Sequence, residues 1–195
     1  MAAEGTVSML VDSTGNLYAY GTNSAGAAGV QTLSNTVPQL INTYGKKVSL
    51  LSTSGSHSLI LTNDNVLLAT GSNTFGQLGI GNTTSFNYFV DVNMTNIDNR
   101  TVISISAGSV ASIVLCSDGT VYVFGQGFSV RIPTRLGSTL TGRHIIDAIY
   151  TNGNALFVAS DNQMYGWGSD TYGLLGRNTL GTAIAYAGAS VNMCF

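Results

Sequence analysis

Apolar and polar residues alternate in short blocks along the chain, and one arrangement of these blocks occurs four times. A short apolar run is followed by a turn rich in Asp, Asn and Gly, and then by an apolar and aromatic run that closes on a glycine. Runs of this length, separated by residues that accept positive φ angles, are typical of β-hairpins. We therefore predict four hairpins, with turns at residues 12–16, 63–65, 117–120 and 160–162.

The spacing of two sets of glycines indicates that the hairpins belong to a sequence repeat. The closing glycines, at positions 21, 71, 125 and 168, are 50, 54 and 43 residues apart. The glycines that open each copy, at positions 5, 55, 108 and 153, are 50, 53 and 45 residues apart. Because the two sets drift together, the repeat is about 50 residues long, a period that in β proteins is typical of propeller blades.

Two further apolar runs follow the hairpin, at residues 37–41 and 48–51 in the first copy. Pro38 fits an edge strand there, because proline cannot donate a hydrogen bond to a neighbouring strand. We predict that each hairpin and the two strands after it form one blade of four antiparallel strands. The corresponding runs of the second and third copies are 89–92 with 102–105 and 132–136 with 145–149.

These elements predict an all-β fold, a partial β-propeller of about four blades of four antiparallel strands. We expect a single repeat domain over residues 1–195. Residues 187–195 are similar to the start of the third copy and are predicted to begin a further repeat. The four predicted repeats span approximately residues 3–52, 53–105, 106–150 and 151–186.

A second glycine-rich segment follows the hairpin in three copies, at residues 23–29, 73–79 and 170–176. Each begins with Asn or Asp and contains spaced glycines, which predicts an irregular loop with left-handed positions, held by the Asn or Asp side chain. The third copy lacks this segment and reaches Pro133 eight residues after Gly125.

The composition narrows the classes of partner. Charged residues are 8% of the chain, the net charge is -2, and the seven Lys and Arg residues are scattered, so we expect no nucleic-acid binding. No window of about 20 residues is apolar enough to span a bilayer, so we expect no membrane insertion. Three Asn-x-Thr triplets, at Asn82, Asn93 and Asn99, leave secretion open.

The chain lacks the residue clusters that catalysis or metal binding requires. The only histidines are His57 and His144, and neither lies in a Ser, His and Asp pattern. One aspartate recurs per repeat, and turn chemistry accounts for each without calcium: Asp12, Asp64, Asp118 and Asp161. We therefore predict that the chain is not an enzyme and has no catalytic, cofactor-binding or metal-binding residues. Cys116 lies in an apolar run and is interpreted as a buried free thiol.

Several segments resemble the repeat of the regulator-of-chromosome-condensation family. They are residues 55–59, 73–81, 117–125 and 165–168, and the resemblance extends over residues 3–176. It implies a β-propeller, which in this family typically has seven blades, and it makes His57 a packed structural residue. The repeat signature comprises Gly21, Gly55, His57, Gly71, Gly76, Gly79, Gly108, Gly125, Gly153, Trp167, Gly168, Gly173 and Gly176.

The resemblance implies a protein-binding function. Family members act in nucleotide exchange on a Ran-type small GTPase, chromatin binding, ubiquitin-ligase regulation and enzyme inhibition, and the implied compartment is the cytoplasm or the nucleus. Our leading interpretation is a non-enzymatic protein-binding or scaffold module that presents propeller-face loops. The alternatives are a guanine-nucleotide exchange factor fragment and a self-assembling structural subunit. The candidate partner contacts are aromatic residues: Phe75, Phe86, Tyr88, Phe128 and Tyr172.

Four copies are fewer than the seven blades that the resemblance implies. The chain is then either a piece of a larger propeller or a subunit that completes its array with another chain. An open array exposes a blade face and strand edges, and a low charge does little to oppose association. We therefore predict that the isolated chain self-associates.

Overall fold

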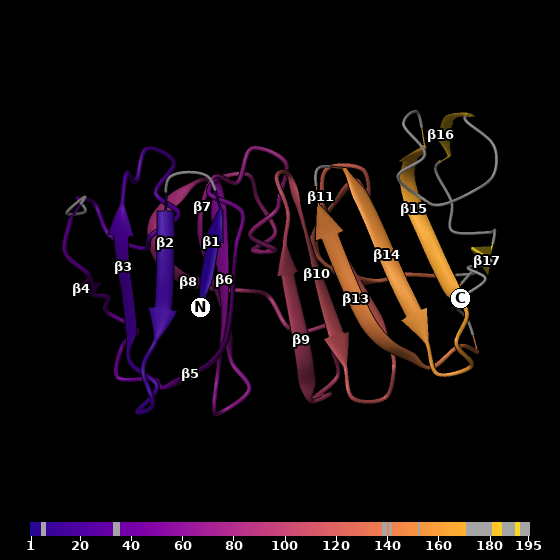
Figure 1. Cartoon of the computed structure of the whole chain (residues 1–195), viewed down its shortest axis with the longest axis horizontal. Coiled ribbons are helices and arrows are strands. Elements are labelled where there is room, and N and C mark those ends of the chain that lie inside the picture. The colour runs from indigo at the N-terminus through magenta and orange to yellow at the C-terminus, as the bar shows by residue number, and fades with distance from the viewer. Residues whose placement is uncertain are drawn as a thin grey trace.

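The computed structural model describes residues 1–4, 7–32, 36–137, 140, 142–151, 153–170, 181–184 and 190–191. Over these residues the chain forms seventeen β-strands in four antiparallel sheets, and no helix (Figure 1). The all-β prediction is therefore confirmed. Within the same residues there is no helix with the length and apolar character needed to cross a membrane.

The first two sheets contain four strands each, and neighbours in the chain are neighbours in the sheet. The first sheet consists of β1 (Ala2–Glu4), β2 (Val7–Val11), β3 (Leu17–Gly21) and β4 (Gln39–Leu40). The second consists of β5 (Val48–Thr53), β6 (His57–Thr62), β7 (Leu67–Gly71) and β8 (Phe86–Asp91).

The third and fourth sheets repeat this order. The third consists of β9 (Val102–Ala107), β10 (Ala111–Cys116), β11 (Val121–Gly125) and β12 (Val130–Arg135). The fourth consists of β13 (Ile145–Thr151), β14 (Asn154–Ala159), β15 (Met164–Asp170), β16 (Gly181–Ile184) and β17 (Ser190–Val191), and both β16 and β17 pair with β15.

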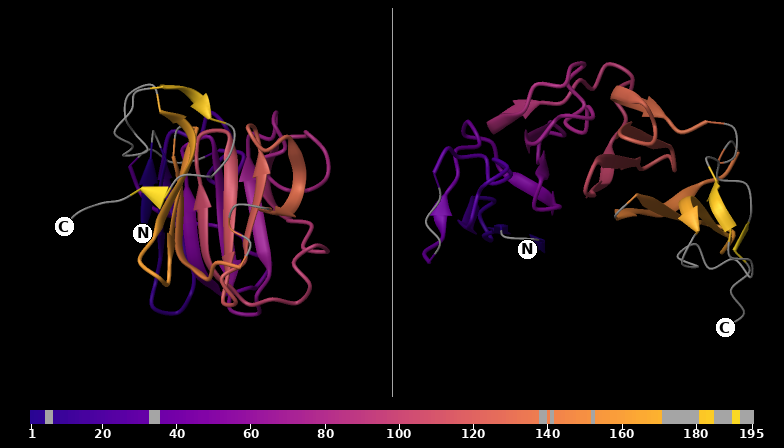
Figure 2. Two further views of the ribbon diagram at one scale, coloured as in Figure 1. Left: turned by 90° about the vertical axis from the view of Figure 1, so that its right-hand side faces the viewer. Right: turned by 90° about the horizontal axis from the view of Figure 1, so that it is seen from above.

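The four sheets stand side by side in an arc, which Figure 2 shows from above. The first strands of neighbouring sheets, β1, β5, β9 and β13, contact one another and lie along the inner side of the arc. The later strands of each sheet follow outward. Sheets that radiate from a common centre are the blades of a β-propeller, so the prediction of a partial β-propeller is confirmed.

The grouping of strands into blades differs from the prediction at one point. We expected residues 48–51 to end the first blade, but they lie in β5, the first strand of the second sheet. The same shift places residues 102–105 in β9 and residues 145–149 in β13. The reason is that the fourth strand occupies the outer edge of the hairpin, so the next strand can pair only with the following hairpin, as Leu51 does with Ile60. The proposed repeat boundaries stay a prediction.

The hairpin turns form where the sequence predicted them. In each sheet the strands on either side of the turn pair in the same register, as in Val11 with Leu17 and Leu61 with Leu67. One residue of each turn has a left-handed backbone, which explains the preference for Gly and Asn at that place. The φ angles are 81° at Gly15, 61° at Asn65, 77° at Gly119 and 63° at Asn162.

Apolar clusters fill the three spaces between neighbouring sheets. Between the second and third sheets, Leu59 and Leu61 of β6 share a buried cluster with Val114 and Cys116 of β10. Cys116 is a buried free thiol, as interpreted, and burial raises its pKa to about 11. Residues that alternate with these face the previous sheet, so each β-sheet is apolar on both faces, which is expected when both faces are covered.

A turn of one sheet also binds the start of the next sheet. At the second junction the Asn65 amide donates to the Arg100 carbonyl at 2.9 Å and accepts from the Val102 amide at 2.9 Å. At the first junction the Val48 amide instead donates to the Gly15 carbonyl at 2.9 Å. These bonds fix the hairpin turn of one blade beside the first strand of the next blade.

Candidate functional site

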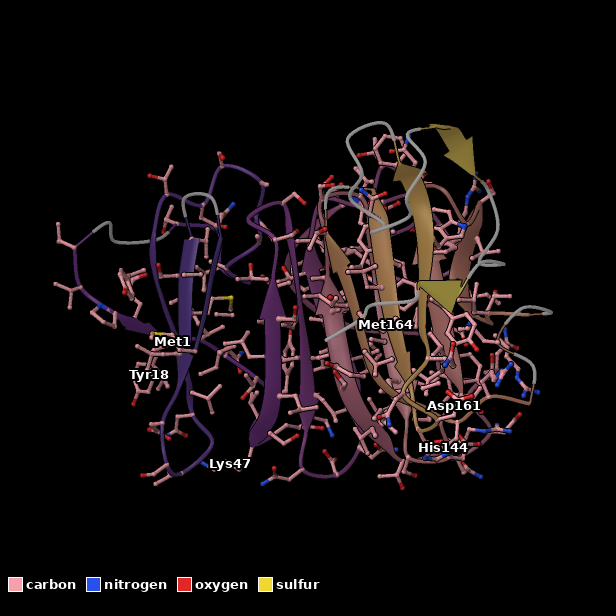
Figure 3. All side chains as sticks on the ribbon, turned by 45° about the vertical axis from the view of Figure 1, so that its right-hand side comes forward. Met1, Tyr18, Lys47, His144, Asp161 and Met164 are labelled. Carbon is pink, nitrogen blue, oxygen red and sulfur yellow. The ribbon has the colours of Figure 1, made fainter. Side chains whose placement is uncertain are left out.

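The strands of all four sheets run between two sides of the arc, and these two sides differ in chemistry. We call the end that carries the turns at residues 12–16, 63–65, 117–120 and 160–162 the hairpin end, and the end with the loops that follow β3, β7 and β11 the loop end. In Figure 3 the labelled residues Lys47, His144 and Asp161 all lie at the hairpin end, with Lys47 apart from the other two.

All ion pairs of the described residues lie at the hairpin end, and three of them repeat one geometry. A basic residue just before the first strand of a sheet contacts the turn aspartate 18 residues later in the same sheet. The pairs are Lys46 with Asp64 at 2.6 Å, Arg100 with Asp118 at 2.7 Å and Arg143 with Asp161 at 2.6 Å. The repeat thus places its charge at this end.

These contacts shift the pKa values of the turn aspartates. The Lys46 ammonium holds the pKa of Asp64 below its ordinary value. Burial raises the pKa of Asp118, but hydrogen bonds from Arg100 and Thr120 outweigh it and lower the pKa overall. In the first sheet no base is needed, because the Asn16 amide and the Thr14 hydroxyl donate to Asp12 and lower its pKa.

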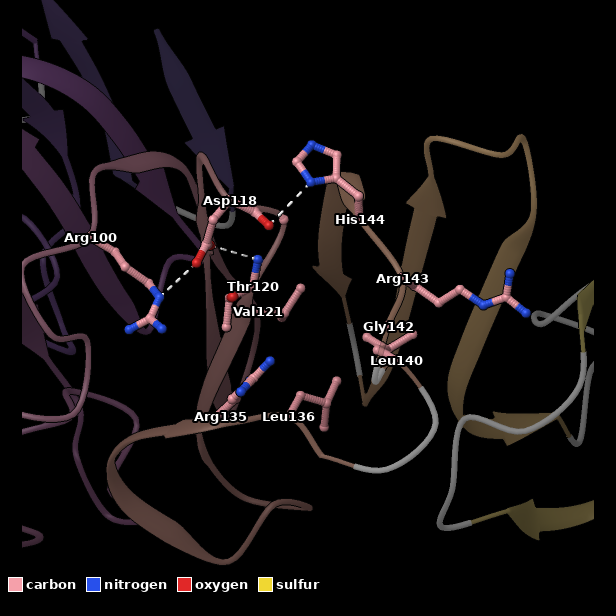
Figure 4. Close-up of a pocket in the computed structure, with 11 residues that line it drawn as sticks. Arg100, Asp118, Thr120, Val121, Arg135, Leu136, Leu140, Gly142, Arg143 and His144 are labelled. Atoms are coloured by element: carbon pink, nitrogen blue, oxygen red, sulfur yellow. Dashed lines mark hydrogen bonds and ion pairs between the residues drawn. The ribbon is translucent and has the colours of Figure 1, made fainter.

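A cavity of about 350 Å³ lies at the hairpin end beneath the third sheet (Figure 4). Arg100, Arg135 and Arg143 line it together with the apolar side chains of Leu136 and Leu140. Part of its lining comes from described residues between β12 and β13: Leu136, Leu140, Gly142, Arg143 and His144. Three of the seven Lys and Arg residues of the chain therefore surround one cavity.

The three arginines differ in their partners. Arg100 is held by Asp98 at 3.0 Å as well as by Asp118, and its pKa is raised by these carboxylates. Arg143 turns toward Asp161. Arg135, an exposed residue at the end of β12, forms no ion pair with any described residue. Among the described residues, the cavity therefore holds one guanidinium without a carboxylate partner, which can bind an anionic group.

The position of Arg135 is occupied by different types of side chain in the first and second sheets. In register, Arg135 pairs with Tyr122, Asp91 pairs with Leu68, and Leu40 pairs with Tyr18, and these three positions are equivalent. A second cavity, of about 330 Å³, lies beneath the first sheet and is lined by Leu40. One structural position thus changes from apolar to acidic to basic along the arc.

Arg135 was not predicted as a functional residue, because residues 132–136 were interpreted only as an outer strand. Aligning that run with residues 37–41 and 89–92 shows that one position varies between Leu, Asp and Arg while the next residue is always apolar.

The predicted aromatic contacts are not brought together as one patch. Phe75 and Tyr88 are 44% and 48% exposed, and Tyr88 packs edge to face on Phe86 with ring centroids 5.2 Å apart. Phe128 instead stacks on Trp167 at 4.1 Å, as part of the contact between the third and fourth sheets. Tyr172 lies outside the described residues.

The first two glycine-rich loops have the predicted construction. The Asn73 side chain donates to the carbonyls of Asn82 and Thr84 and accepts from the Leu78 amide at 2.9 Å. Asn23 accepts from the Ala28 amide in the same way. The third such loop, with Gly173 and Gly176, lies outside the described residues.

The closing glycines of the repeat signature lie where no side chain fits. Gly71 has a φ of 108°, and a Cβ there would lie 2.5 Å from the Ser56 carbonyl oxygen. Gly125 has the same φ within a degree, and its Cβ would lie 2.6 Å from the Val110 carbonyl oxygen. The glycine thus allows the hairpin strand to approach the preceding turn.

His57 lies buried between the second and third sheets. The Ser112 hydroxyl donates to the Gln77 carbonyl at 2.8 Å, so at the 2.8 Å contact between His57 Nε2 and Ser112 Oγ the imidazole is the donor. Burial lowers the pKa of His57 to about 3, so the ring is neutral. This arrangement is that of a structural hydrogen bond between blades.

Within the described residues, no three His, Cys, Asp or Glu side chains are close enough to bind a metal ion. The four turn aspartates lie in four separate hairpins.

Comparison with known proteins identifies the repeat. A family model described as the regulator of chromosome condensation (RCC1) repeat matches residues 48–77 and 102–129. The chain contains RCC1 repeats. The two matches cover β5 to β7 and β9 to β11, so the RCC1 repeat coincides with the hairpin and the strand that precedes it.

One relative of this RCC1-repeat chain is the human E3 ubiquitin-protein ligase HERC2. It is 26% identical over 193 residues, which is 92% of this chain and 4% of HERC2. The chain spans 12% or less of the length of the first curated relatives it matches.

Solved structures share the fold. Human WBSCR16 superposes with a TM-score of 0.86 at 19% identity, over 98% of this chain and 52% of that one. Prp20p from Saccharomyces cerevisiae, whose structure is reported with its binding to Gsp1p and histones, superposes with a TM-score of 0.83 at 20% identity, over 98% of this chain and 50% of Prp20p. The RCC1-repeat chain thus has the fold of about half of each of these two chains.

Proposed function

We propose that the chain is a non-enzymatic protein-binding module that contacts its partner through the hairpin end. The cavity beneath the third sheet is the anchor of this contact. The observation that carries the proposal is the guanidinium of Arg135, which has no carboxylate partner among the described residues and lines a cavity together with Leu136 and Leu140. Arginine in such a setting is common among residues that dominate protein interfaces.

The cavity favours one class of partner surface. Arg135 offers a planar, permanently charged donor group that suits a carboxylate, and Leu136 and Leu140 offer apolar contact beside it. The occupant is therefore an acidic side chain of a protein partner with an apolar side chain next to it. The protein partners named for Prp20p support this class of function without fixing the partner of this chain.

A second candidate function is guanine-nucleotide exchange on a Ran-type small GTPase. It is supported by the fold shared with Prp20p, a protein reported to bind Gsp1p. The chain would then accelerate the release of labelled GDP from the GTPase, whereas a binding module would leave the release rate unchanged.

The loop end is the alternative contact surface for a binding module. It presents Phe75 and, on the outer strand of the same sheet, Phe86 and Tyr88. These residues remain candidate contacts, and binding there would not depend on Arg135.

Two charge reversals on one strand distinguish the two ends. Arg135 lies at the hairpin end of β12 and Arg131 near its loop end, and both are exposed. With a fluorescent peptide of alternating Glu and Leu as the probe, Arg135→Glu should weaken binding about tenfold or more, which corresponds to about 1.4 kcal/mol.

The control, Arg131→Glu, makes the same change of charge and should leave binding nearly unchanged. Binding should also weaken as salt is added, since the contact is partly exposed. Equal losses in both variants, or none in either, would refute the role of the hairpin end.

A further inference from the structure

The first and last sheets each leave one broad face without a neighbouring sheet among the described residues (Figure 2). In the first sheet, Val7 and Met9 pack toward the second sheet, so the alternating residues face outward. Those outward residues are Ser8, Leu10, Tyr18 and Tyr20, and all of them are only partly buried.

The fourth sheet has the opposite open face. Ala155 and Phe157 pack toward the third sheet, so their neighbours in the strand face outward. The outward residues of β14 and β15 are Asn154, Leu156, Val158 and Met164. Ile149 of β13, which is paired with Leu156, is 51% exposed. Tyr18 and Met164, labelled in Figure 3, mark these two faces on the first and last sheets.

The open face of the first sheet has the composition of faces that are buried inside the arc. The positions equivalent to Ser8, Leu10 and Tyr18 are Ser58, Ile60 and Leu68 in the second sheet, all buried against the first. In the third sheet they are Ser112, Val114 and Tyr122, all buried against the second. The first sheet therefore carries a blade-to-blade face that no described residue covers.

Asn154, on the open face of the fourth sheet, has an incomplete set of hydrogen bonds. Its side chain is 7% exposed, and its Oδ1 atom is buried without any hydrogen-bond partner. Buried side-chain amides without a partner are rare in folded proteins. Asn154 precedes Ala155, which pairs with Trp167, as His57 precedes Ser58, which pairs with Thr70, so Asn154 and His57 hold equivalent positions.

The equivalence defines the missing contact. His57 reaches across its junction and bonds the hydroxyl of Ser112. The residue equivalent to Ser112 in the first sheet is Ser8, on the open face. A first sheet packed on the fourth sheet would thus bring the Ser8 hydroxyl to the Asn154 amide.

We propose that two copies of this chain pair head to tail, with the first sheet of each copy packed on the fourth sheet of the other. Each chain corresponds to about half of a solved β-propeller chain, so two such junctions close a ring. The net charge of -2 offers little repulsion. The proposal does not rest on the proposed function, because it uses the sheet faces and not the hairpin end.

The mass of the wild-type chain in solution tests the pairing. Light scattering after gel filtration should give twice the 20.2 kDa of one chain. A mass of 20.2 kDa at every concentration would overturn the proposal, and so would an open series of larger species, because the ring closes at two copies.

Single substitutions locate the contact. Leu10→Glu and Leu156→Glu each place a charge on one of the two faces and should each yield a monomer with an unchanged β-type circular dichroism spectrum. Ile103→Glu is the matched control, since Ile103 is 45% exposed on β9 of the third sheet and belongs to neither face, and it should leave the pair intact. Dissociation by the control alone would overturn the assignment.

Disulfide trapping tests the register without depending on charged variants. Ser8→Cys and Asn154→Cys are prepared separately, each with Cys194→Ser, and are then mixed and oxidised. A cross-link between the two different variants, absent from either one alone, is expected. Links that form equally well between copies of the same variant would mean a symmetric contact of like faces and would overturn the head-to-tail arrangement.

Discussion

At the residue scale, His57 shows how a polar side chain can hold two apolar blades in register. It is fully buried, and its one strong contact crosses to Ser112 of the next sheet. Since burial lowers its pKa to about 3, the ring stays neutral in the folded protein while the unfolded chain protonates near pH 6.5.

This difference predicts a dependence of stability on pH. Below pH 6.5 the unfolded state binds a proton that the folded state does not, so the free energy of unfolding falls as the pH is lowered toward 3. Between pH 7 and pH 5 the wild-type chain should lose about 2 kcal/mol in urea unfolding from this group.

His57→Gln is the control for that effect, because glutamine has a donor for Ser112 and does not titrate. It should lower stability at pH 7 but remove most of the loss between pH 7 and pH 5. An equally steep loss in this variant would assign the pH dependence to other groups.

At the element scale, the turn of one blade fixes the start of the next. Asn65 does so with its side chain, whereas Gly15 and Gly119 do so with their carbonyls. Asn162 has the same place and a φ of 63°, but its exposed side chain bonds no described residue. Comparing variants at Asn65 and Asn162 therefore separates the stability contributed by the hydrogen bonds across the junction from the cost of the left-handed backbone.

Asn65→Ala and Asn162→Ala make one change at equivalent positions. Both lose the residue type that tolerates a left-handed backbone, at a cost of about 1 kcal/mol. Asn65→Ala also loses two hydrogen bonds between sheets and should cost about 1–3 kcal/mol more in chemical denaturation. Equal effects of the two variants would show that the bonds across the junction contribute nothing to stability.

Sequence alone predicts the elements well where local chemistry decides them. Gly15, Asn65, Gly119 and Asn162 mark the turns, and the closing glycines mark the ends of the strands. It does not predict which hairpin a lone strand joins, so the run at 48–51 was assigned to the wrong sheet, because apolar alternation is the same for either neighbour.

The candidate site was harder to predict for a related reason. Arg135 is one residue in a short edge strand, and the residues that line its cavity with it, such as Arg100 and His144, come from other parts of the sequence. Phe128 looked like a surface contact, but its stacking partner, Trp167, is distant in the sequence and comes from the next sheet. Neither the cavity nor the aromatic stacking can be recognised from neighbouring residues in the sequence.

At the scale of the whole molecule, the arc separates two kinds of surface. The open faces of the first and fourth sheets are suited to packing against another sheet. The hairpin end instead carries the ion pairs and the cavity that Arg135 lines. Binding of a partner and pairing of copies can therefore occur together, because they use different parts of the chain.

The most direct test of binding at the hairpin end is a footprint by hydrogen–deuterium exchange, with and without the Glu and Leu peptide. The account predicts slower exchange around Val121 and Leu136, which line the cavity, and no change in residues 72–85 at the loop end. Slower exchange in residues 72–85, with none around Val121 and Leu136, would contradict it.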